Sequence, residues 1–337
     1  MLSSLLLVLL IGAAAWAGAQ AGFYLLLGAV LPYSAVLVFI AGLVRRMIYW
    51  AGSPVPFTIP VTGGQEESLG FIRQAKTDCP SGASGVWARM FFEVAFFRSL
   101  FRNTSAEIQE DCLLTKGPRS IYSSSKWLWA FALLFHYSIL LVFLRHFRFF
   151  MEPTPSCIRF LESLDGIMEL GSPRFFLSAG LMLAALFFLL GRRFFNERLR
   201  YISLPGDYFP LLLLIGIAGT GICLRYFDKA DTTAIKVFIM SLTHFAPVSP
   251  QGLSPLFFTH LALVCALLLY FPFSKLTHMV GIFFSPTRNA PNNSRRVRRV
   301  NPWNPPDQYF TYAEYEDLYR EAMAEAGLPL EKQPDGT

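Results

Sequence analysis

The sequence predicts an all-α polytopic membrane protein with about six transmembrane helices. Of its 337 residues, 53% are hydrophobic and only 15% are charged, a balance that is unlike that of soluble domains. The hydrophobic residues gather into runs of about 20 residues or more, the length that a helix needs to cross a bilayer. Four of the five histidines lie inside two of these runs, although ionisable groups are rare within membranes.

Residues 1–44 are almost continuously apolar, which is too long for one span. We predict an N-terminal pair of transmembrane helices over Leu2–Ala19 and Phe23–Val44, broken near Gln20–Gly22. The first helix lacks the basic segment that begins a signal peptide, so we expect it to be retained.

Residues 45–126 contain no predicted span and form an insert that we expect to be cytoplasmic. Its Trp87–Phe101 segment combines aromatic residues with Arg89 and Arg98, which is typical of an amphipathic helix at the membrane interface. An ordinary solvated helix on a small domain is the alternative. After the insert we predict four spans within 127–285 and then a basic cytoplasmic tail at 286–337. The four spans are Lys126–Phe150, Phe175–Gly191, Tyr208–Arg225 and Pro255–Pro286.

The connections between these spans and the tail carry further signals. Met151–Pro173 is acidic, and Asp228–Ser254 is expected to be a short loop. In the tail, Ser294–Arg299 is a basic run, which favours contact with anionic lipid over nucleic acid. A polar helix is predicted over Thr311–Gly327, ended by Gly327.

The four histidines are spaced so that they can pair across the bundle. His260 and His278 are 18 residues apart, roughly 27 Å along a helix, and share one face. His136 and His146 are ten residues apart, about 15 Å. In antiparallel helices, His136 lies level with His278 and His146 with His260. The two separations differ, so helix tilt and a bend at Pro272 must absorb the difference.

Paired imidazoles inside a membrane suit haem iron, which takes neutral histidine as an axial ligand. A single histidine in a span is more often a polar group bonded to a neighbouring helix, but four in this register favour paired ligands. A transporter or proton channel using these histidines is the alternative, although such proteins more often carry acidic residues in their spans and internal repeats. A haem-free membrane anchor is a third reading. His244, the fifth histidine, is expected to be a surface residue.

Two segments, FHYSILLVFLRHFRFFMEPTP and FTHLALVCALLLYFPFSKLTHMVG, resemble the gamma subunit of respiratory nitrate reductase, a quinol-oxidising di-haem cytochrome b. This resemblance covers roughly Trp127–Ser285. The insert, with PVPFTIPVTGGQEESLGFI and RMFFEVAFFRSLFRNT, instead resembles the M subunit of the Dsr membrane complex of sulfate reducers and sulfur oxidisers. Relatives in heterodisulfide-reductase-type complexes share much of that signature.

The resemblance implies a di-haem bundle that binds two haem b groups. His136 and His278 are the implied ligands of the cytoplasmic-side iron, and His146 and His260 those of the outer-side iron. It also implies electron exchange between the menaquinone pool and a cytoplasmic iron–sulfur subunit related to heterodisulfide reductase, in anaerobic respiration of sulfur compounds. Further membrane and periplasmic redox subunits are implied partners. The five cysteines form no CxxC or CxxCH motif, which excludes covalent c-type haem. Clusters must therefore come from a partner.

Loop charges predict the orientation of the bundle. Arg45–Lys126, Arg192–Arg200 and the tail carry the excess of Lys and Arg, and alternation places them on one side. Because cytoplasmic loops are enriched in positive charge, we expect a multi-pass protein of the cytoplasmic membrane with a cytoplasmic C-terminus. The candidates for contact with quinone at the outer side are cationic, and each is equally well explained as a snorkelling interfacial residue: Arg145, Arg148, Arg225 and Lys229.

Overall fold

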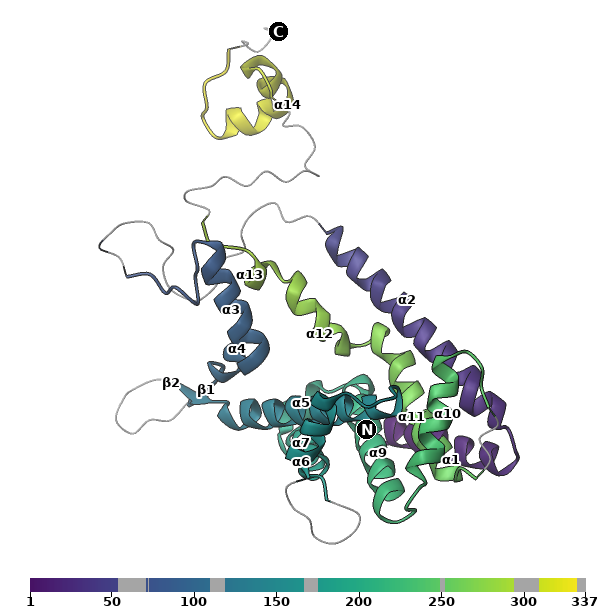
Figure 1. Ribbon diagram of the computed structural model, residues 1–337. Coiled ribbons are helices and arrows are strands. Elements are labelled where there is room, and N and C mark those ends of the chain that lie inside the picture. The colour runs from purple at the N-terminus through teal and green to yellow at the C-terminus, as the bar shows by residue number, and fades with distance from the viewer. Residues whose placement is uncertain are drawn as a thin grey trace.

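A computed structural model describes residues 1–53, 71, 73–109, 119–166, 175–248, 252–293 and 309–331. Six of its helices are long and apolar enough to cross a membrane, which confirms the predicted all-α polytopic fold (Figure 1). Three of these candidate spans are single helices: α1 (Leu2–Gln20), α7 (Leu177–Phe195) and α9 (Pro205–Tyr226). The span Leu26–Ala51 begins with a π-helical turn (Leu26–Val30) and continues as α2 (Leu31–Ala51). The spans Lys126–Phe149 and Pro255–Phe273 consist of α5 (Lys126–His146) and α11 (Pro255–Tyr270), each followed by a 3₁₀ turn.

Helix α9 is central to the bundle. It packs against α1, α7 and α11, while α7 also packs against α5 and α11 also packs against α2. Leu213 of α9 is fully buried between Val8 of α1 and Leu263 of α11. On its other side Leu214 joins a second apolar cluster with Leu186 of α7. The two histidine-bearing helices, α5 and α11, are therefore both held in place through α9 and its neighbours.

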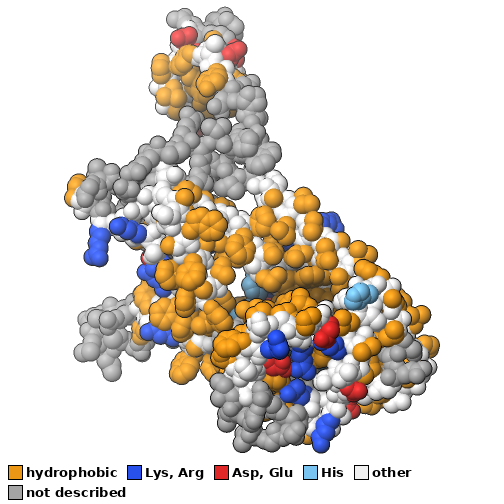
Figure 2. Space-filling model, viewed as in Figure 1, with side chains coloured by type: hydrophobic (Ala, Val, Ile, Leu, Met, Phe, Trp, Pro, Cys, Tyr) orange, Lys and Arg blue, Asp and Glu red, His pale blue; other side chains and the backbone are white. Residues whose placement is uncertain are grey.

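The outer faces of these helices are apolar and exposed. Leu10 on α1 and Leu37 on α2 are 66% and 69% exposed, and hydrophobic side chains are spread widely over the face shown in Figure 2. Exposed apolar surface of this extent is typical of helices that face lipid. The chain is a multi-pass membrane protein.

The predicted break in the N-terminal pair is confirmed. Helix α1 ends at Gln20, and Gly22 follows with a φ of +80°, a conformation that glycine adopts without steric cost. The second helix extends to Ala51, beyond the predicted end at Val44. Arg45 and Arg46 continue the helix because long cationic side chains reach the interface from the end of a span.

The last predicted span is not one continuous helix. Helix α11 ends at Tyr270, and short turns follow at Phe271–Phe273 and Lys275–Thr277 before α12 (His278–Gly281), a turn at Ile282–Phe284 and α13 (Pro286–Asn289). Pro272 supplies no N–H for helix continuation, and the Ser274 Oγ accepts the N–H of Leu276 at 3.2 Å to start the next turn. The separation expected for a straight helix between His260 and His278 is therefore wrong, and the chain bends near Pro272 as expected.

Several short elements were absent from the sequence prediction. Helix α10 (Thr232–Thr243) lies in the segment expected to be a loop, and the Asp231 carboxylate caps it by accepting the Thr233 N–H at 2.8 Å. Helix α6 (Ser156–Asp165) lies in the acidic connection after α5. An antiparallel hairpin in the insert pairs β1 (Thr104–Gln109) with β2 (Arg119–Ser124), from Thr104 opposite Ser124 to Gln109 opposite Arg119. A further short helix, α8, spans Glu197–Ile202.

The predicted insert helix is interrupted. Instead of one helix over Trp87–Phe101, the chain forms α3 (Ala83–Phe96) and α4 (Arg98–Phe101), which meet at Phe97.

The predicted tail helix is present as α14 (Tyr312–Glu325). The Thr311 Oγ1 and the Glu314 side chain form a capping box, and Gly327 follows at a φ of +68°. The basic run at Ser294–Arg299 lies outside the described residues.

Candidate functional site

The structure brings His136 and His278 together. Their ring centroids are 6.0 Å apart, with the ring planes at 76°. The Nδ1 of His136 lies 2.7 Å from the Ala132 carbonyl oxygen, and the Nδ1 of His278 lies 2.8 Å from that of Lys275. A carbonyl only accepts, so each Nδ1 carries the proton and each Nε2 is the nitrogen available to a metal.

His146 on α5 and His260 on α11 are the second expected pair. The Nδ1 of His146 is 2.6 Å from the Val142 carbonyl oxygen. The Nδ1 of His260 is 2.9 Å from Thr220 Oγ1, whose hydroxyl donates to the carbonyl of Gly216 at 2.8 Å. A tautomer with the proton on Nδ1 satisfies both contacts, since the imidazole then donates to Thr220 while the hydroxyl donates to Gly216. Nε2 is again the available nitrogen.

Helix α9 shapes the space around His260. A Cβ at Gly221 would lie 3.3 Å from the Cε1 of His260, so a larger residue there would displace the ring. Thr220 and Gly221 thus fix the tautomer and the position of this histidine. Thr220 was not identified from the sequence, because nothing in its spacing relates it to a histidine on another helix.

All four imidazoles therefore share one arrangement, with Nδ1 held by a neighbouring oxygen and Nε2 available. Metal–imidazole bonds of about 2 Å on each side of an iron place two axial rings roughly 6 Å apart between their centres. The His136–His278 separation of 6.0 Å fits this requirement. No group of three or more His, Cys, Asp or Glu side chains capable of holding a metal occurs among the described residues. Two imidazoles suit a metal whose other ligands come from a macrocycle, as in haem.

The four rings differ in exposure. His146 and His278 are exposed, and His136 and His260 are half-buried. Figure 2 shows histidine side chains at the base of a recess on this face of the molecule. His244, by contrast, is exposed at the end of α10, where its Nδ1 lies 2.7 Å from the Met240 carbonyl oxygen. It has no histidine partner among the described residues, as expected of a surface residue.

A polar cluster lies next to His146. The guanidinium of Arg145 is 2.6 Å from the carboxylate of Asp165, and their side chains are only 11% and 2% exposed. This carboxylate also accepts the backbone N–H of Ser178 at 2.8 Å and its hydroxyl at 2.6 Å. Arg145 and Arg225 both stack on the ring of Phe176, at 3.7 and 4.1 Å.

This packing distinguishes the four cationic candidates from one another. Arg145 and Arg225 are engaged with protein groups, not only with the membrane surface. Arg148 forms an ion pair with Glu162 and lies 4.8 Å from the centroid of Phe149. Lys229 is exposed in the loop after α9. Asp165 was not identified from the sequence, since its burial arises from the packing of α6 against α5.

Known proteins resemble this chain over most of its length. A family model described as the nitrate reductase gamma subunit matches residues 104–291. A protein of Archaeoglobus fulgidus described as an Hdr-like menaquinol oxidoreductase cytochrome b-like subunit is 43% identical over 287 residues, which cover 83% of this chain and 84% of that protein. A protein of Archaeoglobus profundus with the same description is 40% identical over 305 residues, covering 88% and 87%.

These matches confirm the resemblance to nitrate reductase gamma subunits and to Hdr-type proteins. The family match begins before the expected Trp127 and includes the hairpin of the insert. Because the match spans more than half of the chain and both relatives exceed 30% identity over most of it, this chain belongs to the nitrate reductase gamma subunit family.

Proposed function

We propose that this chain is the haem b subunit of a membrane menaquinol-linked oxidoreductase complex. His136 and His278 hold the haem toward the cytoplasm, and His146 and His260 hold the one toward the outer face. Bound haem supplies one-electron transfer, with its potential set by ligands, burial and hydrogen bonds. The complex passes electrons between the menaquinone pool and a cytoplasmic iron–sulfur subunit related to heterodisulfide reductase, in the respiration of sulfur compounds.

The observation that carries this proposal is the facing pair of His136 and His278, whose ring centroids lie 6.0 Å apart. The Nδ1 of each of the four histidines lies at hydrogen-bond distance from an oxygen, and the histidines come from α5, α11 and α12. Hydrogen-bonded Nδ1 atoms fix the tautomer and raise the basicity of the ligating nitrogen. A proton path needs imidazoles that can exchange protons at both nitrogens, so this arrangement favours metal ligands over the transporter alternative.

The outer side supplies charged groups for a quinol. Oxidation of a quinol releases two protons with its two electrons, and the cluster of Arg145, Asp165 and Ser178 lies beside His146. Cationic groups here attract the electron-rich oxygens of a quinone ring, and the buried carboxylate keeps Arg145 in position. This location couples electron flow into the bundle with proton release at the outer face.

The proposed function is tested by reduction with quinol. Purified complex is mixed with a short-chain menaquinol under anaerobic conditions, and the absorption bands of haem b are followed over time. The proposal predicts that the menaquinol reduces the haem. Protein that carries haem b but stays oxidised with menaquinol, while dithionite reduces it, would contradict a link to menaquinol.

The proposed orientation is tested with cysteines. Cys157 in α6 is exposed on the connection that we place outside, whereas Cys79 of the insert is buried and makes a poor probe. An impermeant thiol reagent should label Cys157 in intact cells, and Cys157→Ser should abolish that labelling. In the Cys157→Ser background, Tyr309→Cys, at a position that is 88% exposed in the tail, should react only after lysis. The opposite pattern would invert the orientation.

A further inference from the structure

Helices α3 and α4 of the insert meet at an unusual residue. Phe97 has a φ of 50° and a ψ of 47°, the left-handed conformation that bulky residues seldom adopt. Such a conformation persists only where the surrounding structure enforces it, and it tends to occur at functional sites. The contacts of Phe97 show what enforces it and what it serves.

Helix α5 holds the chain on the N-terminal side of Phe97. The indole N–H of Trp129 donates to the Phe96 carbonyl at 2.7 Å, and the hydroxyl of Tyr137 donates to that of Ala95 at 2.9 Å. These carbonyls are at the end of α3, where the helix itself supplies no partner. On the other side of Phe97, the backbone N–H of Ser99 donates to the Glu93 carboxylate at 3.1 Å.

The ring of Phe97 packs on a proposed haem ligand. It meets the imidazole of His136 edge to face, with centroids 4.9 Å apart and planes at 88°. Phe135 flanks the same imidazole at 5.0 Å, and His278 lies at 6.0 Å. His136 therefore lies between two phenyl rings and the histidine with which it pairs. Phe97 is the insert's contribution to this enclosure.

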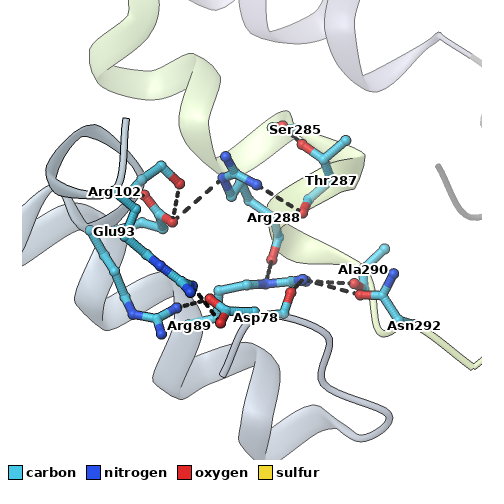
Figure 3. A network of polar contacts seen from close by, with 11 residues as sticks. Asp78, Arg89, Glu93, Arg102, Ser285, Thr287, Arg288, Ala290 and Asn292 are labelled. Atoms are coloured by element: carbon cyan, nitrogen blue, oxygen red, sulfur yellow. Dashed lines mark hydrogen bonds and ion pairs between the residues drawn. The ribbon is translucent and has the colours of Figure 1, made fainter. Parts of the chain in front are cut away.

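A buried arginine ties the insert to the chain beyond His278 (Figure 3). Arg89 of α3 is 2% exposed and donates to the carbonyl oxygens of Arg288 at 3.0 Å and Ala290 at 2.7 Å. It also reaches the Asn292 side-chain oxygen at 3.1 Å. The Asn292 backbone N–H in turn donates to the Pro80 carbonyl at 2.7 Å. A planar guanidinium suits this set of acceptors, and an ammonium group cannot reproduce it.

Ion pairs hold α4 to the segment that precedes α3. Asp78 is paired with Arg98 and Arg102, both C-terminal to Phe97. Burial raises the pKa of Asp78, but its hydrogen bonds and charge interactions with the two arginines outweigh burial and hold the pKa below its usual value. The carboxylate therefore stays charged at neutral pH and keeps its ion pair with Arg98 of α4.

We propose that α3 and α4 form the cytoplasmic wall of the inner haem site, with Phe97 as a positioning residue for His136. Arg89 clamps this wall to the segment that follows His278, so the insert joins the elements that carry both inner ligands. The inference rests on the proposed function and adds to it a role for the insert. The wall excludes water from the inner site, and solvent exposure is one of the factors that set a haem potential.

The test uses Phe97→Gly, which allows the left-handed backbone and removes the ring. Its matched control is Trp87→Ala, a change at an aromatic residue of α3 that is 77% exposed. Haem content, redox titration and the electron paramagnetic resonance spectrum are measured on each purified protein. We expect Phe97→Gly to keep both haems, to lower the midpoint potential of one of them because water stabilises the ferric charge, and to change its low-spin signal. Trp87→Ala should match the wild type.

The affected haem is identified in a His260→Ala background, which by the proposed pairing retains only the inner haem. There the Phe97→Gly shift should persist, and in a His136→Ala background it should vanish. Potentials and spectra unchanged by Phe97→Gly would overturn the proposal, whereas wild-type protein without haem would refute the proposed function itself. Arg89→Lys keeps the charge and should lower the same potential by loosening the wall. If Arg89→Lys leaves this midpoint potential unchanged, Arg89 does not hold the wall in place.

Discussion

Replacing His260 with alanine should remove one of the two haems and leave the other bound. The Nε2 of His260 is directed to ligation because its Nδ1 is bonded to Thr220, and alanine supplies no substitute ligand. The haem-to-protein ratio of the purified variant should fall by about half, since each proposed site needs both of its axial histidines. The same loss is expected for His146→Ala.

His244→Ala is the matched control for these variants. His244 is exposed outside the spans, so its removal should leave the haem content unchanged. Equal haem loss in His244→Ala and His260→Ala would show that the measurement reports general damage to the protein. A full haem complement in His260→Ala would exclude His260 as a ligand.

Replacing Asp165 with asparagine should strongly destabilise the bundle. The change keeps the shape of the side chain but leaves the Arg145 cation without its counter-ion in a buried position. Removing one partner of a buried ion pair costs about 3–5 kcal/mol, because the remaining charge stays desolvated. Thermal unfolding of the detergent-solubilised protein should show a clear fall in Tm. The stacking of Arg145 on Phe176 offsets only part of this loss.

Two variants make this result specific. Glu152→Gln breaks the pair with Lys236, in which the carboxylate side chain is 61% exposed, and exposed pairs contribute only about 0–1 kcal/mol. Adding Arg145→Gln to Asp165→Asn removes the stranded charge and should recover part of the stability. If Asp165→Asn lowers the Tm no more than Glu152→Gln does, the buried pair does not stabilise the bundle.

The membrane spans could be predicted from the sequence because apolar length alone decides them. The break at Gly22 and the end of the tail helix before Gly327 followed from local chemistry in the same way. Helix α10 and the hairpin were not predicted, since a helix of 12 residues is too short to span a bilayer and short strands in a polar insert have weak periodicity. Local pattern therefore accounts for the long elements and not for the short ones.

The histidines of the candidate site were found from their spacing, but the groups that position them were not. Thr220, Asp165 and Phe97 act on residues in other elements, and no local pattern relates them to those residues. The bend after Tyr270 was expected from Pro272, yet the direction in which the chain continues depends on contacts made through Arg89 and Asn292. Tertiary contacts decide these details.

The central claim is that His136 pairs with His278 and His146 with His260, each pair holding one haem. The most direct test is the haem-to-protein ratio of two double variants, measured beside the wild type. The account predicts two haems per chain in the wild type and one in His136→Ala/His278→Ala, since that variant keeps the outer pair intact. It predicts none in His136→Ala/His260→Ala, because each pair then lacks one ligand. A bis-histidine haem retained by His136→Ala/His260→Ala would contradict the pairing.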